Sequence, residues 1–184
     1  MILYHVSDRE IRCPDIRHGR KNADFGQGFY LTCDREFACR WAGENAVVNI
    51  YEFDETGLDI RRFDRGVDWF RYIFDNRRLR DGLSADAVIG PISNDTLFDT
   101  LGLFSSGFLK PEEALRLLSV GPEYTQAALK TEKAVSRLKF IRSEGIARTD
   151  AGTLKAEREA YGTALEEELK RMAGEEAGED AADE

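Results

Sequence analysis

A chain of 184 residues, of which 42% are hydrophobic and 10% aromatic, is long enough to bury one hydrophobic core. The net charge is −9, yet nine acidic and only two basic residues lie from Leu165 onward, so the rest of the chain carries −2. A nearly neutral body argues against a protein that binds nucleic acid through a basic surface, and leaves open a nucleic-acid acceptor approached transiently. The apolar runs are only a few residues long, which excludes a membrane-spanning helix.

The N-terminal sequence MILYHVSDRE lacks a basic start followed by a long apolar stretch, so we expect no signal peptide. The three cysteines, Cys13, Cys33 and Cys39, have spacings that match no zinc motif, and we expect no metal. Their odd number favours reduced thiols, which indicates a cytoplasmic protein.

The first elements surround a long polar connection. Residues 1–7 (MILYHVS) predict a short buried strand, and residues 29–32 (FYLT) a second one. Residues 8–28 between them are polar, locally basic and punctuated by Pro and Gly. A helical spacing of apolar residues follows, with Asp34 as its expected N-cap and Gly43 as its expected end.

The rest of the body alternates between strand and helix patterns. Strands are predicted at 47–54, 85–93 and 124–129, and helices at 66–78, 94–107 and 110–121, with 132–141 a short helix that runs into a last strand. The sequence therefore predicts an α+β domain over residues 1–145, with five or six strands.

The composition changes beyond residue 145, and residues 146–184 form an acidic tail. Its first part is rich in Ala, Glu and Lys and should form a loosely held helix, because its leucines are too sparse for a core. Its last ten residues, EEAGEDAADE, have no large apolar side chain and should be disordered.

Three motifs in this order resemble the ADP-ribosyltransferase superfamily. They are LYHVS, which matches the strand with the first signature His, DFGQGFYLTCDREFACRWA, which matches the Gly-x-Gly-aromatic-Tyr strand and its helix, and YTQAALKT, where the third signature residue is found. A closer resemblance is to an uncharacterised bacterial family placed in that superfamily. It covers Ile2 to about Ile141 and includes the further motifs PDI…GR, VVNIYEF, DAVIGPISND and TQ…TEKAVSRLKF.

This resemblance implies a split β-sheet with flanking helices and NAD as a co-substrate. The implied activity is that of a mono-ADP-ribosyltransferase, which cleaves the nicotinamide-ribose bond and transfers ADP-ribose to an acceptor, protein or nucleic acid. Members of the bacterial family often look like toxins encoded beside a small antitoxin, so the resemblance also implies an antitoxin as partner.

The residues match that chemistry, because the site must hold a planar ring and stabilise a ribose that gains positive charge. The implied catalytic residues are His5, Tyr30 and Gln126. The implied NAD-binding residues are Tyr4, His5, Ser7, Arg20, Gly26, Gly28, Phe29, Tyr30 and Asp95. Lys21 is a further candidate for the pyrophosphate, and we expect His18 to be exposed without a role.

Each candidate also has an ordinary structural interpretation. His5 and Tyr30 could be core residues of their strands, Gly26 and Gly28 could form a plain turn, and Asp95 could be a helix N-cap. The basic residues before Gly26 could be an ordinary solvated surface.

Gln126 departs from the superfamily pattern, in which this position is usually Glu. An amide can accept the same hydrogen bond, but it supplies no charge to a developing cation. Three alternatives follow: a slower transferase, a second acid that helps (Glu123 or Asp95), or a silent module that binds NAD or ADP-ribose and acts through a protein partner. A purely structural interaction protein is a weaker alternative, which predicts no groove beside His5 and Tyr30.

Overall fold

The computed structural model describes residues 1–80, 82–93 and 109–180, with side chains as far as residue 175. The chain divides into two compact units, one of residues 1–92 and 124–149 and the other of residues 93–123 and 150–184. The expected boundary at residue 145 lies near one of these divisions. The second unit also includes an internal segment, residues 93–123, which no pattern in the sequence separates from the first.

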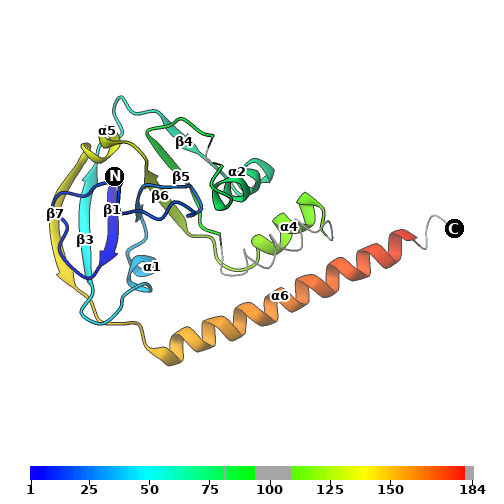
Figure 1. Cartoon of the computed structure of the whole chain (residues 1–184). Helices are drawn as coiled ribbons and strands as arrows, with labels where there is room; N and C mark the ends of the chain where they lie inside the picture. The colour runs from blue at the N-terminus through cyan, green and yellow to red at the C-terminus, as the bar shows by residue number, and fades with distance from the viewer. Residues whose placement is uncertain (81, 94–108, 181–184) are drawn as a thin grey trace. The chain divides into compact units, whose positions relative to one another are not determined.

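The first unit contains a mixed seven-stranded sheet in the order β4-β5-β6-β2-β1-β3-β7 (Figure 1). Its strands are β1 (Ile2–Ser7), β2 (Phe29–Thr32), β3 (Val47–Phe53), β4 (Ile60–Arg62), β5 (Ala87–Pro91), β6 (Thr125–Leu129) and β7 (Leu138–Gly145). Among the strands that the structure describes, β4 and β5 are the pair that runs parallel. The α+β class is thus confirmed, and the described residues form seven strands, where five or six were expected. The short β4 was missed because its sequence, IRR, shows no apolar alternation.

Three helices of this unit lie where the sequence predicts helices. They are α1 (Arg35–Cys39), α2 (Val67–Arg77) and α5 (Glu132–Val135). Asp34 caps α1 as predicted, since its carboxylate accepts a hydrogen bond of 2.9 Å from the Phe37 amide. The helix ends at Cys39, four residues before Gly43. The predicted helix within residues 94–107 lies outside the described residues.

The core of the first unit lies on one face of the sheet. Residues that face each other across neighbouring strands point to the same side, so the register identifies that face. Its buried members are Leu3, Phe29, Leu31, Tyr51, Phe53, Ala87, Ala127 and Leu129, joined by Ala134 and Val135 of α5. We call this side the core face, and the other side the α2 face. On the α2 face, helix α2 buries Trp69, Phe70 and Ile73.

The junction between β1 and β2 is the thinnest in the sheet. These strands share a single pair of opposed residues, Tyr4 and Thr32, whereas β1 and β3 share six. The sheet is continuous, but it is weakly joined near its centre, between β1 and β2.

The second unit contains α4 (Pro111–Leu118) and the long helix α6 (Ala151–Asp180) (Figure 1). Helix α4 starts with Pro111 and has acidic residues in its first turn, as predicted. Helix α6 confirms a helical tail. However, it continues through Asp180, where disorder was expected from the sequence.

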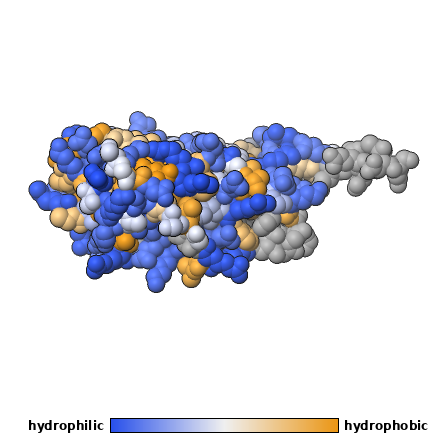
Figure 2. All heavy atoms as spheres, turned by 90° about the horizontal axis from the view of Figure 1, so that it is seen from above, coloured by the Kyte–Doolittle hydropathy of each residue, from blue (hydrophilic) through white to orange (hydrophobic). Residues whose placement is uncertain are grey.

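One face of the molecule is mostly polar. Figure 2 shows hydrophilic residues over most of the visible face, with hydrophobic residues in small patches between them. The large apolar side chains that are exposed include Trp41, Leu79 and Leu169. Among the described helices, none combines the length and apolar character needed to cross a bilayer.

Candidate functional site

The tight turn before β2 is held by the hydroxyl of Tyr30. This hydroxyl accepts a hydrogen bond of 2.9 Å from the Phe25 amide and donates one of 2.7 Å to the Gly26 carbonyl. Lys130 donates to the Phe25 carbonyl at 2.7 Å. Burial raises the pKa of the Tyr30 hydroxyl well above its usual value, so it stays protonated at neutral pH. We call residues 24–26 the DFG turn.

Gln126 of β6 reaches the same turn. Its Nε2 donates a hydrogen bond of 3.0 Å to Oδ2 of Asp24, and both residues are 5% exposed. Oδ1 of Asp24 forms an ion pair with Arg77 of α2. Asn76, which is fully buried, donates to the Asp24 carbonyl at 3.1 Å. Asp24 is therefore held through both its side chain and its backbone, and its carboxylate is buried and paired with a guanidinium.

His5 of β1 lies where β1 and β2 separate. Its Nδ1 donates to the backbone carbonyl of Tyr30 at 2.7 Å, and its ring lies 4.4 Å from the Phe29 ring between centroids. The hydrogen bond fixes the tautomer with the proton on Nδ1. Burial lowers the pKa of the imidazole below its ordinary value, although the hydrogen bond to Tyr30 opposes this shift. His5 is thus a neutral imidazole whose Nε2 is an acceptor, and no described residue donates to that atom.

The three implied catalytic residues lie on adjacent strands, but their side chains do not share one face. Thr32 is opposite both Tyr4 and Gln126, so Tyr30 and Gln126 point to the α2 face. His5 points to the core face, in agreement with its contact to Phe29. The structure therefore brings Tyr30 and Gln126 together at the DFG turn and joins His5 to them through the Tyr30 backbone. This differs from a single cleft lined by all three side chains.

Three other implied NAD-binding residues serve the fold of β1 and β2. Tyr4 is half-buried on the α2 face, and Phe29 is buried in the core. The Ser7 hydroxyl donates to the Arg9 carbonyl at 2.5 Å and accepts from Nδ2 of Asn49 at 2.9 Å. These bonds hold Ser7, the last residue of β1, against the turn that follows the strand.

The two glycines allow close backbone approaches. Gly26 has a φ of 75°, which favours glycine, and its amide donates to the Ala23 carbonyl at 3.0 Å. A Cβ at Gly28 would lie 2.7 Å from the Leu129 carbonyl oxygen, so only glycine fits against β6. Both observations explain the glycines as parts of the turn and its packing.

The remaining candidates lie at the surface or outside the described residues. Arg20, Lys21 and Glu123 are exposed. His18 is exposed as expected, with Nδ1 2.9 Å from the Asp15 carboxylate. Asp95 lies outside the residues that the structure describes.

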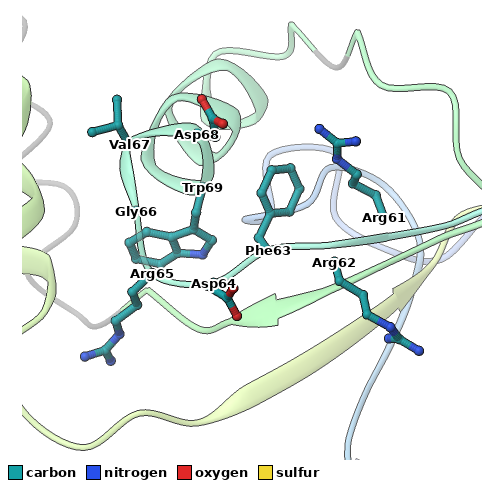
Figure 3. A pocket seen from close by; sticks show the side chains of 9 residues that line it. All are labelled: Arg61, Arg62, Phe63, Asp64, Arg65, Gly66, Val67, Asp68 and Trp69. Atoms are coloured by element: carbon teal, nitrogen blue, oxygen red, sulfur yellow. The ribbon is translucent and has the colours of Figure 1, made fainter.

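A hollow of about 350 Å³ lies along the connection between β4 and α2 and is lined by residues 61–69. Its three arginines point in three different directions (Figure 3). The Arg61 guanidinium lies over the Phe63 ring, Arg62 pairs with Glu55, and the Trp69 indole donates to the Pro91 carbonyl. Neither His5, Tyr30 nor Gln126 lines this hollow, and its arginines do not form a clamp for one anion.

Sequence reasoning missed Asp24, Asn76, Arg77 and Lys130 as neighbours of the implied site. Asp24 opens the motif DFGQGFYLT, which is the one available signal. The others are 52 to 105 residues away from their partners in the turn, so only the folded sheet and α2 bring them together.

The family comparison covers the greater part of this chain. A family model described as "Protein of unknown function (DUF3990)" matches residues 1–140. No curated protein matches the chain, and no solved structure does.

Proposed function

The chain belongs to the DUF3990 family, and we propose that it is an NAD-dependent mono-ADP-ribosyltransferase, the toxin of a bacterial toxin-antitoxin pair. The motif order that resembles the superfamily motivates this proposal. The observation that carries it is the neutral His5 at the thin β1–β2 junction, whose Nε2 is an acceptor to which no described residue donates. A neutral imidazole in this state suits a ribose hydroxyl, which donates a hydrogen bond.

The proposed reaction breaks the bond between ribose C1′ and the nicotinamide nitrogen. The electron pair of that bond leaves with nicotinamide, which becomes neutral, and C1′ gains positive charge. A lone pair of the acceptor then attacks C1′, and the acceptor loses a proton. In this scheme NAD lies across the thin β1–β2 junction. On the core face, His5 accepts a hydrogen bond from a ribose hydroxyl; on the α2 face, Gln126 accepts another and the Tyr30 ring packs against nicotinamide. The acceptor is a protein or nucleic-acid group.

A second candidate is a module that binds NAD or ADP-ribose without turnover and acts through a protein partner. The pairing of Asp24 with Arg77 favours it, because the guanidinium balances the carboxylate nearest to Gln126. A site without an uncompensated negative charge would stabilise a ribosyl cation poorly.

The test compares the purified full chain with its two histidine variants. Wild type incubated with labelled NAD and cell lysate should release nicotinamide and label an acceptor. His5→Ala should lower kcat/KM by about tenfold or more, because a hydrogen bond to the ribose is lost. His18→Ala is the matched control and should change nothing, since His18 is exposed.

The two candidates differ in one outcome. Binding of NAD without nicotinamide release would support the silent module. A wild-type chain that neither binds nor cleaves NAD would refute both.

A further inference from the structure

The amide of Gln126 has a fixed orientation because of its neighbour. An ionised carboxylate only accepts hydrogen bonds, so Asp24 requires the Nε2 donor of Gln126 to face it. Oε1 of the same amide must then point away from Asp24, and no described residue donates a hydrogen bond to it.

We propose that Asp24 is a positioning residue, which dictates an amide at position 126 and presents Oε1 of Gln126 as an acceptor to the ligand. The inference rests on the proposed function in that the ligand is a ribose hydroxyl of NAD. Gln126 then offers the same acceptor that a carboxylate would offer, and the nearest negative charge belongs to Asp24.

The surroundings of Asp24 fit this role. Its side chain is 6% exposed and its Oδ1 is occupied by Arg77, so Oδ2 is the oxygen that faces Gln126. Asn76 holds the Asp24 carbonyl, and Tyr30 holds the next two residues of the turn. The carboxylate therefore has little freedom to turn away from position 126.

Because Asp24 lies beside Gln126, a carboxylate at position 126 would be unfavourable. A Glu there would place a second carboxylate about 3.0 Å from the first, and two like charges at that distance do not both ionise easily. Gln126→Glu should therefore weaken the contact between positions 24 and 126 rather than raise NAD cleavage. Exchanging the two groups, in Asp24→Asn with Gln126→Glu, should keep the hydrogen bond with donor and acceptor reversed.

The experiment measures thermal unfolding of wild type, both single variants and the double variant. Gln126→Glu should lower the midpoint by about 5 °C at pH 7. In Gln126→Glu the two neighbouring carboxyls have a raised pKa in the folded state, so the stability of this variant falls as pH rises. Its loss in midpoint relative to wild type should therefore be smaller at pH 4, where a proton shared by the two carboxyls relieves the repulsion. The double variant should recover at least half of the loss at pH 7. Asn22→Asp, an amide-to-acid change at an exposed position before the turn, is the matched control and should leave the midpoint unchanged.

A second readout is NAD affinity. In the Asp24→Asn variant, residue 24 no longer fixes the orientation of the Gln126 amide, so this variant should bind NAD about fivefold more weakly. The Asn22→Asp variant should bind NAD as wild type does.

The outcomes separate this inference from the proposed function. A double variant no more stable than the sum of the single changes would overturn the role of Asp24. Recovery in the double variant, together with no NAD binding by any of the chains, would keep the Asp24–Gln126 pair and refute the NAD function.

Discussion

The residues of the DFG turn show how one hydroxyl can hold a whole segment. Tyr30 bonds to both the Phe25 amide and the Gly26 carbonyl, so its hydroxyl replaces backbone partners that a tight turn cannot supply. From the sequence alone, Tyr30→Phe is expected to leave NAD binding nearly unchanged, because the ring that is expected to stack on nicotinamide remains. The structure adds a cost that this expectation did not include.

We therefore expect Tyr30→Phe to lower the free energy of unfolding by about 1–2 kcal/mol, since a buried amide and carbonyl lose their partner. Urea unfolding followed by far-UV circular dichroism measures this change. Tyr4→Phe is the matched control, because its half-buried hydroxyl forms no hydrogen bond with the described residues. Equal losses in the two variants would contradict a special role for the Tyr30 hydroxyl.

At the scale of elements, Asp86 ties three segments of the first unit together. It lies just before β5 and accepts hydrogen bonds from the Asp59 amide before β4, at 2.9 Å, and from Thr131 at the start of α5, at 2.8 Å. Lys133 of α5 adds an ion pair at 2.7 Å. The hydrogen bond from Lys133, together with those from Asp59 and Thr131, lowers the pKa of the Asp86 carboxyl to about 2.

Asp86→Asn should lower the unfolding midpoint by a few degrees at pH 7, because the charged acceptor is lost. The folded-state pKa is depressed, so the stabilisation is complete above the unfolded value of about 4 and disappears as pH falls through 2. The difference in midpoint between wild type and Asp86→Asn should therefore shrink between pH 4 and pH 2. A difference that is constant over this range would contradict the ionised role of Asp86.

Local patterns predicted most elements of the fold but not the contacts of the site. Short apolar, β-favouring runs predicted β1 and β2, and apolar alternation predicted β3. The Asp34 cap predicted the start of α1, and all of these signals act over a few residues. The faces of His5 and Gln126 depend on the register of strands that are far apart in sequence. The ion pair between Asp24 and Arg77 likewise depends on how α2 packs. Neither the register nor this packing leaves a local pattern to read.

At the scale of the whole chain, the acidic tail proves to be part of a packed unit. Helix α6 has few apolar residues, so the sequence alone predicts that a truncation after Thr149 affects neither folding nor NAD binding. In the structure Met172 of α6 is buried, and Glu168 is buried and bonded to Nε of Arg116 at 2.8 Å. Arg116 of α4 also pairs with Glu175, so the charges of α6 are partly balanced by α4.

Truncation after Thr149 should therefore leave the sheet of the first unit folded and release α4. An isolated helix of eight residues is marginal in water, and α4 would also expose the apolar Leu117 and Leu118. In hydrogen exchange followed by mass spectrometry, we expect residues 111–118 to lose at least about tenfold in protection, while β1 and β6 keep theirs. A chain that lacks only residues 181–184 is the control and should exchange as wild type does. Unchanged protection of α4 in the truncated chain would mean that α6 contributes little to this unit, and that its acidic surface, rather than its packing, needs an explanation.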